Sequence, residues 1–525
     1  MTITGVLLIG EEEVVGTQAP VRATNPATGA ELEPLFAGGG EVEVDRACTL
    51  AEAAFDIYRE TSQADRAAFL RAIAKNIIEI GDELIERAMA ESGLPRPRLE
   101  GERGRTTGQL EMFADIVERG GFIGAVIDTA LPDRKPLPRP DLRLRRIALG
   151  PVAIFGASNF PLAFSVAGGD TASALAAGCT VVVKAHPAHP GTSELVGRAI
   201  QRAVKECGLP AGVFSLVGGV GNEVGQAMVK HPAIKAVGFT GSRAGGLALM
   251  RSAAARPEPI PVYAEMSSVN PVFLMEHALA AKAETLAKGF VDSLVLGVGQ
   301  FCTNPGLAIG VESEGFARFR EAAAAEVTTR AAGTMLSPGI HAAYVKGVAK
   351  LGSAGSVTTL AQVQAEAGCK GAPALFAVDA ADLLANPELG EEVFGPSSLL
   401  VSCTSAEQMR QVAEQIEGQL TATILAEDAD ADAIRPLLSV LERKVGRIVY
   451  NGYPTGVEVA WAMVHGGPFP ATSDSRTTSV GAGAIERFLR PVSYQNLPQG
   501  LLPGALKDGN PLGIPRVVDK TAGTV

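Results

Sequence analysis

Short, uninterrupted apolar runs alternate with segments of helical length over residues 146–264 of this chain. The runs occupy residues 152–155, 181–183, 213–217, 236–239 and 261–264. Continuous apolar runs of this kind are typical of strands buried on both faces, and the Ala-rich or amphipathic segments between them predict helices. The alternation therefore predicts a parallel sheet covered by helices, which binds its ligands beyond the carboxyl ends of its strands.

The same pattern restarts after Asn270 and continues to about Val449, with an apolar run at 271–275 and a long helix over 278–296. We therefore predict an α/β fold with two doubly wound parallel-sheet domains, which suits a chain of 525 residues. Three segments lie outside this pattern: helices over 45–92, a Pro- and charge-rich linker or protruding arm over 131–146, and a tail after Arg490 that is either disordered or pinned to a neighbour.

Charge and cysteine usage exclude several classes of protein. The formal charge of −11 argues against a nucleic-acid partner. The apolar run at 6–9 lacks a basic flank and is followed by Gly10 and three glutamates, so it predicts an exposed N-terminal strand and no membrane partner. The six cysteines have no CxxC spacing, which argues against a disulfide framework or a zinc site and favours a reducing cytoplasm.

Cys302 lies in a glycine-flanked polar loop, residues 299–306, directly after the long apolar helix. A lone cysteine is more often a small core residue, and we keep that interpretation for Cys48, Cys179 and Cys207. Loops on a rigid scaffold are where reactive groups tend to lie, so Cys302 is a candidate nucleophile.

Two polar residues follow apolar strands. Asn159, in the loop after the first parallel strand, is either a turn residue or an amide that holds an oxyanion at the sheet edge. Glu265 ends the run at 261–264, where burial can raise the pKa of its carboxyl group toward neutrality and make it a usable base. An ordinary strand-end Glu paired with a Lys or Arg is the alternative interpretation.

The glycine-rich segment 218–225 follows a strand and opens a helix, although it does not fit the G-x-G-x-x-G dinucleotide pattern cleanly. Residues 239–242 end the next strand, and their hydroxyl groups could meet a phosphate at a helix N-terminus. His186 and His189 have a spacing that suggests a metal pair, but the prolines that follow each of them favour loop histidines, and no metal is predicted.

Together these segments resemble the aldehyde dehydrogenase superfamily over roughly residues 20–490. The matching residues occur in the family's order: Asn159-Phe160-Pro161-Leu162, Lys184, Gly221 and Gly225, Phe239-Thr240-Gly241-Ser242, Glu265, Gln300-x-Cys302-Thr303, and Glu391-Glu392-Val393-Phe394-Gly395-Pro396. Each match alone is weak, but the ordered set is highly specific.

The resemblance implies a covalent route. Cys302 attacks the aldehyde carbon, the Asn159 amide and the backbone N–H of Cys302 hold the oxyanion, and Glu265 activates the water that hydrolyses the thioester. It also implies a nicotinamide cofactor bound by Lys184, Gly221, Gly225, Ser242, Glu392 and Phe394. Trp461 and His465 would line or support the mouth of the site without a catalytic role.

One departure from the family bears on the cofactor. Many NAD-preferring members have a Glu three residues after the conserved Lys, whereas Pro187 stands there in this chain. A Glu would repel the 2′-phosphate of NADP, so its absence predicts that NADP is preferred, with NAD possible.

Segments 155–161, 265–271 and 300–306 are this chain's forms of three family motifs. They resemble the forms found in the branch that oxidises 2,5-dioxovalerate (α-ketoglutaric semialdehyde) to 2-oxoglutarate in sugar-acid breakdown. A branch that acts on long-chain fatty aldehydes is the alternative. A CoA-acylating enzyme usually lacks the basic Glu, and a non-catalytic descendant would be expected to lose Cys302 or Glu265.

The resemblance also assigns roles to the domains and implies a homodimer or homotetramer. The expected division is a dinucleotide-binding domain of residues 1–130 and 147–264, a catalytic domain of residues 265–455, and an oligomerisation arm and tail of residues 131–146 and 485–525.

Overall fold

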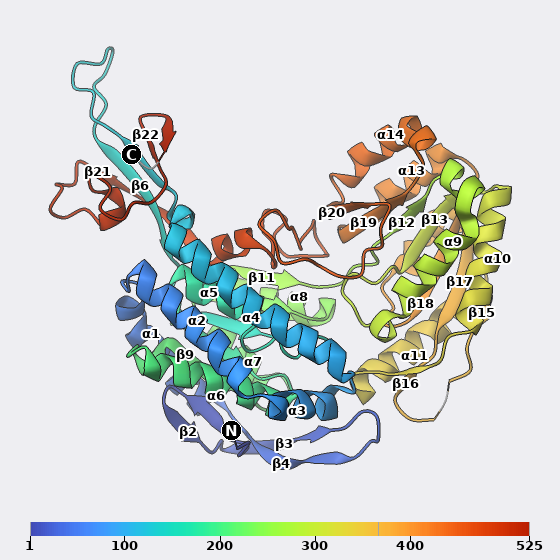
Figure 1. The fold of residues 1–525 in the computed structure, drawn as a ribbon, viewed down its shortest axis with the longest axis horizontal. Helices are drawn as coiled ribbons and strands as arrows, with labels where there is room; N and C mark the ends of the chain where they lie inside the picture. The colour runs from blue at the N-terminus through green and yellow to red at the C-terminus, as the bar shows by residue number, and fades with distance from the viewer. Residues whose placement is uncertain (1, 366, 524–525) are drawn as a thin grey trace.

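The structure, a computed structural model, describes residues 2–365 and 367–523 and contains two large sheets and one smaller, projecting sheet (Figure 1). The first large sheet has seven strands in the order β11-β10-β7-β8-β9-β1-β2. Its strands are β1 (Leu7–Ile9), β2 (Glu12–Val14), β7 (Val152–Phe155), β8 (Val181–Lys184), β9 (Phe214–Val217), β10 (Ala236–Thr240) and β11 (Val262–Glu265). The strands β7 to β11 run parallel, as the alternating pattern predicts.

Helices cover both faces of this sheet. Along β7, Val152 and Ile154 join one hydrophobic cluster while Ala153 and Phe155 join another. The first cluster includes residues of α2 (Gln63–Glu79), α4 (Arg96–Arg119), α5 (Gly169–Ala177) and α6 (Pro190–Glu206). The second includes residues of α1 (Glu41–Tyr58), α7 (Glu223–Lys230) and α8 (Arg243–Ala254). The predicted helices over 45–92 are therefore α1, α2 and α3 (Asp82–Ser92).

The expectation of an exposed N-terminal strand is wrong. Residues Leu7, Leu8 and Ile9 form β1, which lies between β9 and β2 in the first sheet, and all three side chains are buried. Their apolar character reflects this inner position: Leu8 packs in one face cluster, and Leu7 and Ile9 pack in the other.

The second large sheet has the order β15-β17-β18-β13-β12-β19-β20 and is parallel except for its edge strand β15. Its strands are β12 (Val272–Leu274), β13 (Leu307–Val311), β15 (Thr358–Gln362), β17 (Ala374–Asp379), β18 (Ser397–Cys403), β19 (Gln419–Leu425) and β20 (Val445–Tyr450). One face packs on α9 (Glu276–Val295) and α10 (Glu314–Thr328). The other packs on α11 (Pro338–Gly352), α12 (Ala380–Ala385), α13 (Ala406–Gln415) and α14 (Ala431–Leu441).

The third sheet, of five strands, projects away from the first lobe together with the loop that precedes β6 (Figure 1). It has the order β21-β6-β5-β22-β23, from β5 (Ala125–Asp128), β6 (Leu142–Ala148), β21 (Leu489–Gln495), β22 (Arg516–Val518) and β23 (Thr521–Gly523). The described tail is therefore ordered against its own chain rather than disordered. The smaller hairpin of β3 (Gln18–Thr24) and β4 (Glu31–Gly38) lies at the N-terminal end, and β14 (Gly333–Thr334) pairs with β16 (Lys370–Gly371).

Within the described ranges, no helix combines the length and the apolar character that crossing a membrane requires. The two large sheets with their helices form two layered α/β lobes. Strands and loops from both lobes meet at the candidate site.

Candidate active site

The carboxyl ends of three neighbouring strands bring the first group of site residues together. Strand β10 pairs with β11 on one side, where Thr240 faces Glu265, and with β7 on the other, where Phe239 faces Phe155. Glu265 therefore ends one strand, while the loop that contains Asn159 leaves the end of another. Because carboxyl ends of parallel strands share one sheet edge, these side chains meet there as predicted.

The loop that carries Cys302 follows a turn with positive φ values, a backbone conformation that residues with a side chain rarely adopt. After α9, a 3-10 turn (Leu296–Gly299) includes Val298 and Gly299 at φ values of 60° and 64°. A Cβ atom on Gly299 would lie 2.3 Å from the carbonyl carbon of Gly395, so glycine is needed there. Asn270 then secures the loop, because its Nδ2 donates hydrogen bonds to the carbonyl oxygens of Cys302 and Asn304, each at 2.9 Å.

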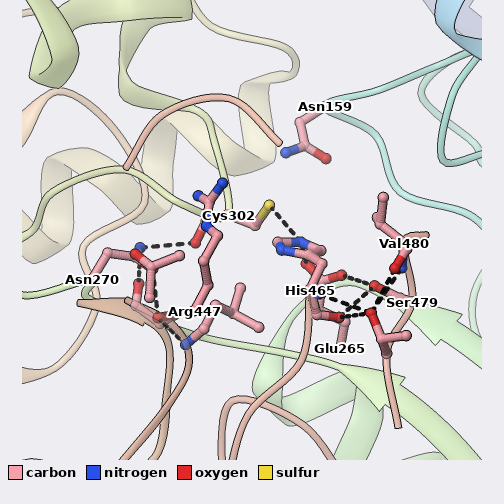
Figure 2. A network of polar contacts seen from close by, with 12 residues as sticks. Asn159, Glu265, Asn270, Cys302, Arg447, His465, Ser479 and Val480 are labelled. Atoms are coloured by element: carbon pink, nitrogen blue, oxygen red, sulfur yellow. Dashed lines mark hydrogen bonds and ion pairs between the residues drawn. The ribbon is translucent and has the colours of Figure 1, made fainter. Parts of the chain in front are cut away.

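His465 connects the candidate nucleophile to the candidate base (Figure 2). Its Nε2 atom lies 3.3 Å from Sγ of Cys302 and 3.0 Å from Oε1 of Glu265. Ser479 donates a hydrogen bond from Oγ to Oε2 of Glu265 at 2.9 Å, so both carboxylate oxygens have partners. Glu265 is 3% exposed and His465 is 1% exposed, so these contacts are shielded from bulk water.

The expectation that burial raises the pKa of Glu265 is wrong in its net direction. Burial does raise that pKa, but the charge of His465 and hydrogen bonds from His465, Ser479 and Cys302 outweigh it, and the pKa is lowered. For the Cys302 thiol, burial and then the neighbouring Glu265 carboxylate raise the pKa well above its ordinary value. The site therefore pairs an ionised carboxylate with a protonated thiol, which is the arrangement a base and a nucleophile need before reaction.

Asn159 adds an amide on the other side of the thiol. Its Nδ2 donates a hydrogen bond to the carbonyl oxygen of Gln300 at 3.1 Å, two residues before Cys302. Figure 2 shows this amide pointing toward the Cys302 thiol from the opposite side to Glu265. An amide N–H beside a nucleophile is placed to stabilise a developing oxyanion.

A cavity that opens to solvent adjoins these residues and is lined by residues of both lobes. Six of the nine predicted catalytic and cofactor-binding residues line it: Asn159, Ser242, Glu265, Cys302, Glu392 and Phe394. Burial raises the pKa of Glu392 to about 8. The hydroxyl oxygen of Ser242 accepts a hydrogen bond from the backbone N–H of Gly245 at 3.2 Å, so it caps α8 at the wall of the cavity.

Lys184, Gly221 and Gly225 are not part of the lining of this cavity: Lys184 ends β8, Gly221 lies in the loop after β9, and Gly225 lies in α7 (Glu223–Lys230). Gly221 has a φ of +69°, and a Cβ atom on Gly225 would lie 3.0 Å from Cε1 of Phe155 and 3.7 Å from Cδ of Lys184. Burial lowers the pKa of the Lys184 ammonium group. A close backbone approach next to a shielded cation fits the sugar and phosphate groups of a dinucleotide.

His186 and His189 have protein partners that suit a loop role. Their rings stack with centroids 5.1 Å apart, and Nε2 of His189 lies 3.1 Å from the carbonyl oxygen of Ala157. A different set, Glu265, Cys302 and His465, presents ligand-type atoms within 4.8 Å of one another. The hydrogen bonds among these three side chains explain their closeness as an arrangement for acid–base chemistry.

His465 has a more central position than the sequence predicted. Sequence reasoning placed it at the mouth of the site without chemistry, whereas the structure places it between Cys302 and Glu265. The available signal was its position directly before Gly466-Gly467-Pro468-Phe469, in a segment that was expected at the mouth of the site.

The aldehyde dehydrogenase family model matches residues 14–468, and this chain belongs to that family. Two relatives are named α-ketoglutaric semialdehyde dehydrogenase: one from Azospirillum brasilense is 57% identical over 99% of this chain and 100% of its own length, and one from Acinetobacter baylyi is 50% identical over 98% of each chain.

Two solved structures share the fold. An aldehyde dehydrogenase from Pseudomonas syringae, solved with NAD+ and octanal, aligns with a TM-score of 0.79 at 23% identity over 94% of this chain and 96% of its own. A 3,6-anhydro-L-galactose dehydrogenase, solved with NAP, aligns with a TM-score of 0.80 at 22% identity over 93% and 99%. These likenesses confirm the predicted α/β class with parallel-sheet domains.

Proposed function

We propose that this enzyme oxidises 2,5-dioxovalerate, the semialdehyde of α-ketoglutarate, to 2-oxoglutarate. The observation that carries the chemistry is the contact chain from Cys302 through His465 to Glu265. The observation that favours this aldehyde is the shared name of the two relatives that match nearly the whole chain.

Each reacting group has a role in this proposal. As the thiol proton passes to the Glu265 carboxylate, Sγ of Cys302 bonds to the aldehyde carbon and forms a thiohemiacetal. The Asn159 amide and the backbone N–H of Cys302 hold its oxygen. After oxidation to the thioester, Glu265 releases the thiol proton to solvent and then takes a proton from water as that water attacks the acyl carbon. As the carbon–sulfur bond breaks, Glu265 returns this proton to Sγ of Cys302, and 2-oxoglutarate leaves.

A nicotinamide cofactor, when bound, supplies the acceptor for the oxidation. Lys184, Gly221, Gly225 and Ser242 would hold its adenosine and phosphate end, and Glu392 with Phe394 would hold its nicotinamide ribose end. This assignment is supported by the shielded Lys184 ammonium and by the close approach that Gly225 permits.

NADP is the proposed preferred cofactor. Pro187 is exposed where a Glu would repel a 2′-phosphate, and Lys184 lies three residues before it. NAD remains usable because the proposed ribose and nicotinamide contacts do not depend on the 2′-phosphate. A steady-state kcat/KM that strongly favours NAD would contradict this assignment.

A long-chain fatty aldehyde is the second candidate substrate, and one observation favours it. Phe160, Phe164, Phe301 and Val480 form an apolar cluster next to the site, and Val457, Val459 and Met463 pack against it. Transfer to CoA is less well supported, because Glu265 is placed to activate water, and a non-catalytic descendant would have no use for the Cys302–Glu265 arrangement.

The proposed enzyme works as a homodimer or homotetramer in a reducing cytoplasm. The projecting third sheet supports the assembly proposal, and the six free cysteines support the compartment. We assign dinucleotide binding to residues 1–130 and 147–264, catalysis to 265–455, and assembly to 131–146 and 485–525.

Comparison of kcat/KM for 2,5-dioxovalerate and decanal tests the substrate. We expect 2,5-dioxovalerate to be favoured by at least about a hundredfold, because a site built for a polar group discriminates strongly against an analogue that lacks it. Faster turnover of decanal would favour the fatty aldehyde assignment instead.

A further inference from the structure

Arg105, in the middle of α4, carries hydrogen-bond donors that no described residue uses. Its Nε and Nη2 atoms are shielded from water and have no partner within residues 2–365 and 367–523. Burial lowers the pKa of this guanidinium, against the opposing effects of Cys302 and Glu102. A shielded cation with unused donors is costly unless an anion arrives to satisfy it.

The guanidinium of Arg105 packs against two aromatic side chains of the apolar cluster next to the site. Its Cζ lies 5.2 Å from the ring centre of Phe164 and 5.8 Å from that of Phe160. The Phe164 ring in turn lies 6.2 Å from the His465 ring. Burial and the Glu265 carboxylate raise the pKa of the Cys302 thiol, and the positive charge of Arg105 offsets part of that rise. Arg105 and Cys302 are thus near enough for their charges to interact.

Two other arginines near the site are already engaged. Arg98 donates from Nη2 to the carbonyl oxygen of Asn159 at 3.3 Å and pairs through Nε with Glu102 at 3.5 Å. Arg447 donates to the carbonyl oxygens of Gly456 and Pro454 at 3.0 Å and 2.7 Å. These contacts explain Arg98 and Arg447 as residues that hold loops. Among the described residues, Nε of Arg447 also has no partner, so Arg447 keeps one free shielded donor and Arg105 keeps two.

We propose that Arg105 binds the distal carboxylate of the substrate while the aldehyde group faces Cys302. This inference rests on the proposed function and names its specificity residue. A guanidinium matches a carboxylate with two parallel hydrogen bonds. In 2,5-dioxovalerate, four carbon–carbon bonds separate the two ends, a span of about 5 Å when extended. The methylene groups between them would lie against Phe160 and Phe164.

The test compares 2,5-dioxovalerate with pentanal, which has the same carbon count but no carboxylate. Both are assayed with the parent enzyme, Arg105→Met, Arg105→Lys and the control Arg103→Met, whose native side chain donates to the carbonyl of Gly81 on another side of α4. We expect Arg105→Met to lower kcat/KM for 2,5-dioxovalerate about a hundredfold, mainly through KM, and to change pentanal less than about threefold. Arg105→Lys should recover part of the loss, and Arg103→Met should match the parent.

An equal loss for both aldehydes would overturn the inference, because it would mean that Arg105 only packs against Phe164 or tunes the Cys302 thiol. Unchanged selectivity in Arg105→Met, with a parent enzyme that prefers 2,5-dioxovalerate, would also overturn it while the proposed function stands. A parent enzyme that prefers pentanal would instead overturn the proposed function.

Discussion

Nε2 of His465 lies 3.0 Å from Oε1 of Glu265, and both side chains are almost fully buried. The same nitrogen lies 3.3 Å from Sγ of Cys302. Burial raises the pKa of the Glu265 carboxyl group, and the charge and hydrogen bond of His465 are the largest effects that oppose it. We therefore expect His465 to act as a positioning residue that lowers the pKa of Glu265 beside Cys302.

Replacement of His465 by Gln should move the acidic limb of the kcat–pH profile to higher pH by at least about one unit, the shift that a tenfold change in protonation represents. The sign follows from the lowered pKa of Glu265, whose base form is lost as the pH falls through that value. In the variant the carboxyl group would protonate at higher pH. The control His277→Gln, at an exposed position, should leave the profile unchanged. An unchanged profile in His465→Gln would contradict an effect of His465 on the pKa of Glu265.

Replacement of Pro187 by Glu should convert the cofactor preference toward NAD. A carboxylate at this exposed position would repel the 2′-phosphate, so the NADP-to-NAD ratio of kcat/KM should fall at least about tenfold, or about 1.4 kcal/mol. Pro232→Glu, in another exposed turn, should keep the parent ratio. An unchanged ratio in Pro187→Glu would show that the 2′-phosphate lies elsewhere.

The raised pKa of Glu392, about 8, predicts a pH-dependent affinity for the cofactor. A carboxylate accepts hydrogen bonds from ribose hydroxyl groups better than a carboxylic acid does. The KM for NADP should therefore fall about tenfold as the pH rises from 7 to 9. Glu392→Gln should give a flat profile. Glu391→Gln, which removes the exposed partner of Lys350, should keep the parent dependence, and a flat parent profile would contradict the role assigned to Glu392.

A buried ion pair should stabilise the attachment of the C-terminal segment. Nη2 of Arg487 lies 2.8 Å from Oδ1 of Asp170, and the two side chains are 3% and 10% exposed. Arg487→Met would leave a shielded carboxylate and should cost about 3–5 kcal/mol, seen as a lower Tm. Arg476→Met removes a 2.7 Å pair to Asp474 from an arginine that is 86% exposed, and should cost less than about 1 kcal/mol. Equal Tm values for the two variants would refute the distinction.

Sequence reasoning located the strands well because their signal is local. The runs at 152–155 and 236–239 are strands β7 and β10 to within one residue, since a strand buried on both faces needs an unbroken apolar run. It misjudged the run at 6–9, because the antiparallel pairing of β1 with β9 joins segments about 200 residues apart. No local pattern carries that information.

The same limit applies to the site. Cys302, Glu265 and Asn159 each follow recognisable local patterns, and the structure brings them to one place. The direction of the Glu265 pKa shift depends on His465 and Ser479, which approach from a loop some 200 residues away in sequence. The free donors of Arg105 are visible only once α4 lies against Phe164.

Trapping of the acyl enzyme tests the central claim most directly. Glu265→Gln removes a carboxylate that raises the pKa of the Cys302 thiol, so the sulfur should still attack the aldehyde, although more slowly, while no base remains to activate water. Intact-protein and peptide mass spectrometry after mixing with 2,5-dioxovalerate and NADP should therefore find one 2-oxoglutaryl group on Cys302. The same treatment of Cys302→Ser should leave no adduct. An adduct on another residue, or full steady-state activity in Cys302→Ser, would contradict the account.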